Sequence, residues 1–133
     1  MTEYLDLEDL LALVDDLEVG PVRDLGLLES AARRPRTMLY GTEAYPTIDE
    51  KAAALLDSIV LNHALIDGNK RLGWLAVVVF YGLNAITLDA PDDPAYDLVI
   101  EVAAEHSAVT EIAGRLAAWH DGGEQRPTRT ALG

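Results

Sequence analysis

The 133-residue sequence contains no cysteine, and this absence excludes several kinds of chemistry. Without thiols the chain has no disulfide framework, no thiolate metal site and no cysteine nucleophile, and we expect a cytoplasmic protein. Half of the residues are hydrophobic, which is enough for one core, so we expect one domain over residues 1–121. Residues 122–133 show no apolar period and are expected to form a disordered tail.

Basic residues are scarce. The chain carries 10 Lys and Arg against 23 Asp and Glu, so its formal net charge is −13. This charge disfavours contact with phosphate backbones and anionic lipids, and we expect neither a direct nucleic-acid partner nor a membrane. Residues 1–20 contain no basic side chain, unlike the start of an export signal. The longest apolar run, residues 72–83, is shorter than the about 20 residues that cross a bilayer.

Internal repeats, a Gly-rich phosphate loop and a protein-kinase signature are also missing from the sequence. Nucleotide chemistry would therefore have to come from residues 62–71, where the sequence reads Asn-His-Ala-Leu-Ile-Asp-Gly-Asn-Lys-Arg. This stretch concentrates a histidine, an aspartate, a glycine, an asparagine and two cations between two apolar segments. This stretch is therefore the candidate site for nucleotide chemistry.

Helices are predicted on both sides of this stretch. Thr47 and Glu50 form a capping box, in which each side chain accepts a hydrogen bond from a free backbone amide, so a helix begins there. Its apolar positions repeat every 3.6 residues and carry it to His63. Residues 72–83 are apolar on nearly every side, which predicts a helix buried all round, with residues 69–71 as its first turn.

The start of this second helix predicts an anion site. Free amides and the positive dipole end attract phosphate at a helix N-terminus, especially after a glycine such as Gly68. Lys70 supplies a point charge, and the Arg71 guanidinium can contact two phosphate oxygens at once. Asn69 can position an oxygen without adding charge.

Asp67 and His63 suit two further tasks at such a site. A carboxylate cannot usefully face a bare phosphate, but it can bind Mg²⁺ that bridges nucleotide phosphates. An imidazole can remove a proton from a hydroxyl at neutral pH. His106 and His120 lack metal-ligand spacing and are expected to be surface histidines.

These residues also have ordinary explanations. A histidine at a helix end can act as a cap or pack, and Lys70 and Arg71 can be solvated surface. However, cations in a first helical turn oppose the helix dipole, which is unfavourable unless an anion compensates them. We therefore favour a phosphate site.

The rest of the chain is also predicted to be mainly helical. Helices are expected after the cap residues Asp6 and Asp24, after Asp93 with Pro94 at the first helical position, and after Ser107. With the two central helices, this predicts a compact all-α fold of about six helices.

Residues 36–46 lose the helical period and predict a loop or an irregular hairpin. Arg33 and Arg34, just before it, either interact with the C-terminal end of a helix or contact a target or phosphate. Tyr40 and Tyr45 either pack on the core or face a partner. The sequence leaves both pairs of alternatives open.

Residues 63–71 resemble the Fic signature, His-x-Phe-x-Asp-Gly-Asn-x-Arg, in the form with Lys before Arg that marks death-on-curing (Doc) toxins. The positions that agree in type and spacing are His63, Asp67, Gly68, Asn69, Lys70 and Arg71. Residues 23–30 and 40–47 also look like this family, so the resemblance covers roughly residues 4–120.

Three positions depart from the family pattern. Ala64 stands where Pro or Ile is usual, Leu65 where Phe is usual, and Leu72 where Thr is usual. The family Phe anchors the loop in the core. A smaller Leu65 is expected to leave a void costing on the order of 1 kcal/mol and to loosen the loop.

The resemblance implies an activity, cofactors and a target. Doc toxins transfer the γ-phosphoryl group of ATP, with Mg²⁺, to a threonine of the translation elongation factor Tu, which inhibits translation. The family hairpin, here Tyr40, Gly41 and Tyr45, holds a segment of the target beside the active site by strand addition. Lys70 stands where AMP-transferring Fic enzymes have Gly, which favours phosphoryl transfer; AMP transfer and a non-catalytic interaction module are the alternatives.

The resemblance also implies regulation by a partner. Fic proteins that restrain themselves carry an inhibitory helix with a [Ser/Thr]-x-x-x-Glu-[Gly/Asn] pattern, whose glutamate pairs with a second arginine of the motif. Ser107 and Glu111 match the start of this pattern, but Ile112 stands where Gly or Asn is required. Trp74 stands at the position of the second arginine. We therefore expect restraint by an antitoxin whose disordered segment folds as a helix in an apolar groove.

Overall fold

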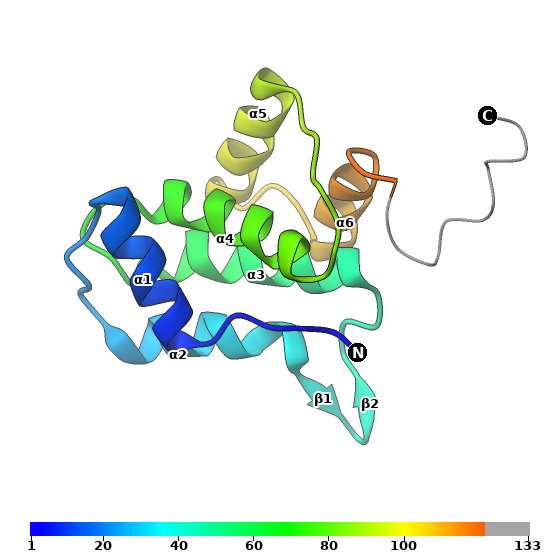
Figure 1. The fold of residues 1–133 in the computed structure, drawn as a ribbon, viewed down its shortest axis with the longest axis horizontal. Helices are drawn as coiled ribbons and strands as arrows, with labels where there is room; N and C mark the ends of the chain where they lie inside the picture. The colour runs from blue at the N-terminus through cyan, green and yellow to red at the C-terminus, as the bar shows by residue number, and fades with distance from the viewer. Residues whose placement is uncertain (122–133) are drawn as a thin grey trace, which may run out of the picture.

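Six α-helices and one short hairpin form the part of the chain that the computed structural model describes, residues 1–121 (Figure 1). The helices are α1 (Leu7–Leu17), α2 (Leu25–Arg33), α3 (Ile48–Asn62), α4 (Asn69–Leu83), α5 (Asp92–Ala103) and α6 (Val109–Ala117). A 3-10 turn, η1 (Arg34–Arg36), leads from α2 into an antiparallel hairpin of β1 (Met38–Leu39) and β2 (Thr42–Glu43). The all-α prediction is confirmed; the predicted disordered tail, 122–133, lies outside the described residues.

Three helices begin at the predicted caps. The Asp6 carboxylate accepts from the Asp9 amide at 2.9 Å, and the Asp9 carboxylate accepts from the Asp6 amide at 2.9 Å. Thr47 and Glu50 form the same reciprocal pair at the start of α3, with both contacts at 3.1 Å. Asp24 caps α2. Local side-chain hydrogen bonds therefore set these boundaries.

Two further predicted helix starts are displaced. α5 begins at Asp92 after Pro91, so Pro94 is its third residue and not its first. At the start of α6 the cap residue is Ala108 and not Ser107. The Ala108 amide donates to the Glu111 carboxylate at 3.1 Å, so a glutamate inside the helix satisfies this end without a hydroxyl cap.

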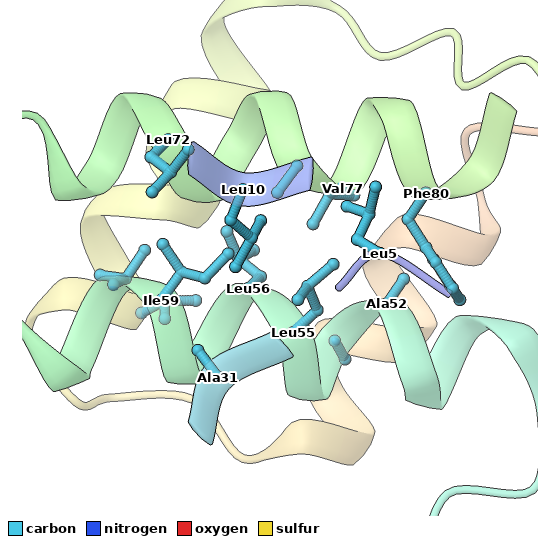
Figure 2. Close-up of a cluster of buried hydrophobic side chains, with 14 of the residues drawn as sticks. Leu5, Leu10, Ala31, Ala52, Leu55, Leu56, Ile59, Leu72, Val77 and Phe80 are labelled. Atoms are coloured by element: carbon cyan, nitrogen blue, oxygen red, sulfur yellow. The ribbon is translucent and has the colours of Figure 1, made fainter. Parts of the chain in front are cut away.

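Helix α3 lies at the centre of the fold and contacts α2, α4, α5 and α6 (Figure 1). Its buried residues pack against α4 and α1 in the core that Figure 2 shows, including Leu55, Leu56 and Ile59. Gly73 on α4 permits close approach, because a Cβ there would lie 2.9 Å from the Val60 side chain. The α3–α4 pair therefore forms a rigid base for the loop that joins it.

Helix α4 is not buried all round, contrary to the sequence prediction. One face packs on α1 and α3 and includes Leu72, Val77 and Phe80. The side chains of Trp74, Leu75, Val78 and Val79 remain partly exposed. Neighbouring helices cover only one side of α4, and much of the other side lines a cavity next to α5.

His120 is not a surface histidine as predicted, whereas His106 is exposed. His120 is 7% exposed, and its Nε2 lies 2.7 Å from Asp49 Oδ1. The buried Tyr81 hydroxyl donates to the same oxygen at 2.6 Å. These contacts tie the chain after α6 to α4 and the first turn of α3.

Within residues 1–121, no helix combines the length and the hydrophobicity needed to cross a bilayer.

Candidate active site

The loop between α3 and α4 holds the polar residues that the sequence singled out. Helix α3 ends at Asn62, and His63 follows it in the left-handed conformation, with φ of 53°. The exposed His63 therefore lies where the chain turns out of α3, as predicted. In Figure 1 this loop lies at the end of the α3–α4 pair that is remote from the hairpin.

The N-terminus of α4 is open. Gly68 precedes the helix with φ of 97°, a conformation that glycine adopts readily. Within residues 1–121 no side chain caps this end, so its first backbone amides point outward without a cap. Lys70 and Arg71 lie exposed in the first turn. Free amides, the helix dipole and two cations together make this end suitable for an anion.

Asp67 and Arg71 form a loose pair above this helix end. An Arg71 guanidinium nitrogen lies 3.4 Å from Asp67 Oδ2, and the side chains are 59% and 80% exposed, respectively. An exposed pair of this kind contributes little to stability. Each side chain can therefore exchange its partner for a ligand, the guanidinium for an anion and the carboxylate for a cation.

Asn69 is engaged within the protein. Its amide oxygen accepts from the Leu65 backbone amide at 3.0 Å, and its amide nitrogen donates to the Leu65 carbonyl at 3.0 Å. The Leu65 side chain is buried, with 2% exposed. Polar contacts thus hold the loop at the position where the sequence predicted that Leu65 would loosen it.

The segment between α1 and α2 supports the other side of the loop. The Gly20 amide donates to the Asp67 carbonyl at 3.0 Å, and the Ile66 amide donates to the Pro21 carbonyl at 2.9 Å. A Cβ on Gly68 would lie 2.5 Å from the Val19 side chain, so only glycine fits there. Sequence reasoning missed Val19 and its neighbours, because these contacts span more than 40 residues and no local pattern predicts them.

All six predicted catalytic, metal-binding and phosphate-binding residues line one cavity of about 790 Å³. They are His63, Asp67, Gly68, Asn69, Lys70 and Arg71. Much of its apolar lining comes from α4 and α5, and includes Trp74, Leu75, Val78, Tyr96, Val99 and Ile100. A cavity of this size, with a polar end and apolar walls, is typical of small-molecule sites.

The predicted target-docking hairpin does not lie beside this cavity. It lies at the opposite end of α3, which at 1.5 Å per residue is about 20 Å long (Figure 1). Tyr40 and Gly41 form its two-residue turn, and Tyr40 is fully exposed. The expectation that the hairpin lies beside the active site came from the family resemblance alone, and residues 38–43 are not among those that line the cavity.

Tyr45 and Arg34 have structural partners. Arg34 Nε donates to the Tyr45 hydroxyl at 2.9 Å, and Arg34 Nη1 donates to Asp57 at 2.7 Å and to Ser58 at 2.9 Å. Burial opposes the charge of Arg34, but the contacts with Asp57 and Tyr45 raise its pKa above the ordinary value. Of the alternatives left open, packing therefore applies to Tyr45, and Arg34 binds α3.

A metal at the loop would depend on Asp67. No cluster of three or more His, Asp or Glu side chains suited to a metal ion occurs in the described part of the chain. Mg²⁺ commonly uses only one or two carboxylates together with phosphate oxygens and water. The exposed Asp67 fits a metal that arrives with a nucleotide, and it does not fit a metal held by the protein alone.

Comparison with known proteins agrees with the geometry. A sequence model of the Fic/DOC family matches residues 4–81, which include the loop and its supporting segment. The chain is also 47% identical over 121 residues to the Toxin Doc of Mycolicibacterium smegmatis (strain ATCC 700084 / mc(2)155), covering 88% of this chain and 93% of that protein. The chain belongs to the Fic/DOC family and, within it, to the Doc toxins.

Proposed function

We propose that this chain is a toxin that transfers the γ-phosphoryl group of ATP to a Ser or Thr hydroxyl of a protein. The translation elongation factor Tu is the proposed target, and inhibited translation is the proposed result. Fic/DOC proteins generally use ATP to modify other proteins. The observation that carries the proposal is the convergence of a histidine, a carboxylate and an uncapped, cationic helix end on one cavity.

The start of α4 binds the phosphates in this proposal. The free amides after Gly68 and the side chains of Lys70 and Arg71 contact phosphate oxygens. Asn69 contributes by holding the loop in shape, because both ends of its amide bind Leu65. The apolar walls of α4 and α5 provide a surface for the nucleoside.

His63 acts as the general base. The target hydroxyl oxygen forms a bond to the γ-phosphorus, the bond to the β–γ bridging oxygen breaks, and ADP leaves with its electron pair. His63 accepts the hydroxyl proton. Asp67 holds Mg²⁺, which neutralises charge on the phosphate oxygens when it is bound. Lys70 occupies space at the loop, which supports the orientation with the γ-phosphate toward the target.

ATP labelled on either the γ- or the α-phosphate tests this assignment with purified elongation factor. We expect only the γ label to enter the protein. The matched variant is His63→Asn, because Asn tolerates the left-handed conformation of this position, and it should lower transfer about 10²-fold. Transfer of the α label would identify AMP transfer, and ATP binding without any transfer would identify an interaction module.

The cavity also supports a proposal for the antitoxin. Its rim exposes Ile66, Tyr96 and Ile100, which are 62%, 67% and 37% exposed. An amphipathic helix can cover such side chains with its apolar face. Since the same cavity holds the predicted phosphate site, an antitoxin segment bound there would exclude ATP.

A further inference from the structure

His63 is exposed and lines the cavity. Within residues 1–121, no hydrogen bond to its imidazole is found. Catalytic bases are commonly oriented by a third group that binds the second ring nitrogen. The backbone that carries His63 therefore sets the position from which its ring enters the cavity.

Arg23 binds that backbone. Its Nε donates to the His63 carbonyl at 3.1 Å, and its Nη2 donates to the same oxygen at 2.5 Å. The backbone amide of Arg23 donates to the Ala64 carbonyl at 2.7 Å, and the Asp24 amide donates to it at 3.1 Å. The side chain of Arg23 therefore holds the His63 carbonyl, and its backbone amide holds the Ala64 carbonyl. Together these two contacts fix the backbone that carries the His63 side chain.

The charge of Arg23 also suits this place. The last carbonyls of a helix carry partial negative charge, and a cation there interacts favourably with the helix dipole. The planar guanidinium offers two parallel donors, whereas an ammonium donates along a single flexible direction. The fork on one carbonyl thus fixes direction as well as distance, in a residue whose φ of 53° departs from the helix.

We propose that Arg23 is a positioning residue that sets the orientation of the His63 imidazole through the His63 carbonyl. This inference rests on the proposed function, in which His63 is the base. It assigns a role in the reaction to the segment between α1 and α2, about 40 residues before the loop in the sequence. Arg23 itself need not contact ATP or the target.

Steady-state kinetics of γ-phosphoryl transfer test the proposal, with Arg23→Gln, Arg23→Lys and the control Arg33→Gln. Arg33 is a matched control because it is exposed, pairs only loosely, at 3.8 Å, with Glu29 on its own helix, and is not among the residues that line the cavity. Because a small misplacement of a catalytic group can cost up to 10²-fold in rate, we expect Arg23→Gln to lower kcat about 10-fold or more, with KM for ATP changed less than about 2-fold. Arg23→Lys should recover part of the loss, and Arg33→Gln should behave like the parent.

A second measurement separates the proposal from the proposed function. Hydrogen exchange at the Ile66 amide reports the loop directly, and we expect it to quicken about 10-fold in Arg23→Gln but not in Arg33→Gln. Unchanged kcat, or a raised KM at constant kcat, would overturn the positioning role. If the parent transfers no phosphoryl group, the proposed function fails; in that case unchanged exchange in Arg23→Gln would also overturn the structural claim, and faster exchange would support it.

Discussion

Gly68 shows how a single residue can decide whether the loop forms. Two requirements meet there: φ of 97°, which disfavours every residue with a side chain, and the Val19 side chain at 2.5 Å from any added Cβ. The sequence identified Gly68 from the motif and from its place before a helix. The second requirement depends on Val19, almost 50 residues earlier, and only the structure shows it.

Substitution of Gly68 by alanine is therefore expected to destabilise the loop. We predict that Gly68→Ala lowers the free energy of unfolding by about 2 kcal/mol or more and also lowers ATP affinity, because left-handed strain and overpacking add. Thermal unfolding and ATP titration measure the two effects.

The matched control is Gly114→Ala. A Cβ on Gly114, inside α6, meets no atom within 4 Å, so this change should stabilise the protein by about 0.5–1 kcal/mol. A Gly68→Ala variant as stable as the parent would mean that the loop adopts another conformation.

Asn69 and His120 mark the limits of residue-level prediction. The sequence suggests a phosphate contact for Asn69, which stays a prediction; the structure shows in addition that both ends of its amide bind Leu65 inside the loop. The sequence also places His120 on the surface, whereas in the structure it is buried and its ring contacts the Asp49 oxygen that Tyr81 also binds. In both cases the side chain has a partner that composition and spacing do not reveal.

At the scale of elements, the helix starts with reciprocal side-chain caps were predictable, and the environment of α4 was not. Caps depend on residues three apart, which the sequence displays. The exposure of one face of α4 depends on where α5 packs, and an apolar residue looks the same in a core and in a cavity wall. The cavity could therefore not be predicted, although its polar end was.

The hairpin combines a rigid base with a strained tip. The buried Lys51 ammonium donates to Glu43 at 2.6 Å and to the Tyr45 carbonyl, which holds the base against α3. At the tip, Tyr40 has φ of 50° and is fully exposed. Its backbone conformation is therefore unfavourable, and no burial of its ring offsets the strain. Backbone strain of this kind often accompanies function.

We expect Tyr40→Asn to raise the free energy of unfolding by about 1 kcal/mol, because Asn tolerates the left-handed conformation. If Tyr40 contacts the protein target, the same variant should raise KM for the target and leave ATP affinity unchanged. Chemical denaturation and transfer kinetics measure both effects. A variant that is more stable and equally active on the target would exclude Tyr40 from the target-docking role that the family resemblance implies.

Tyr81 links α4 to the start of α3, and its hydroxyl is expected to stabilise the fold. Burial, followed by the hydrogen bond to Asp49, raises the pKa of Tyr81 far above its ordinary value of 10.0. At pH 7 we predict that Tyr81→Phe lowers the free energy of unfolding by about 1–3 kcal/mol, because the buried Asp49 carboxylate loses a donor. Phosphoryl transfer should be unaffected at temperatures where the variant is folded.

The pH dependence follows from the raised pKa. Below about pH 10 the tyrosine is protonated in both states, and its contribution is fully present. Above it the unfolded chain loses the proton while the folded chain keeps it, so stability falls by about 1.4 kcal/mol per pH unit more in the parent than in Tyr81→Phe. Parallel stability curves for the two proteins above pH 10 would contradict this assignment.

For the whole molecule, charge and openness of the site predict how it is controlled. The chain has a net charge of −13, yet its cavity ends in two exposed cations, so the site is a local exception on an acidic protein. Within residues 1–121, no side-chain hydrogen bond caps the α4 N-terminus. In the proposed function this uncapped end binds ATP, so we expect restraint to come from a separate inhibitor.

We therefore predict that expression of the chain alone slows bacterial growth and that co-expression of its antitoxin restores it. Ile100→Glu, on the cavity rim, should weaken rescue by the antitoxin, because it places a charge on the proposed apolar contact. Growth curves with and without the antitoxin measure the effect. Full rescue of Ile100→Glu would place the antitoxin on another surface.

The most direct test of the central claim is the intact mass of elongation factor Tu recovered from cells that express either the parent or His63→Asn. The parent should increase that mass by one phosphoryl group, and His63→Asn should leave it unchanged. An increase by one AMP, or equal growth arrest by both chains with unmodified elongation factor, would contradict the account.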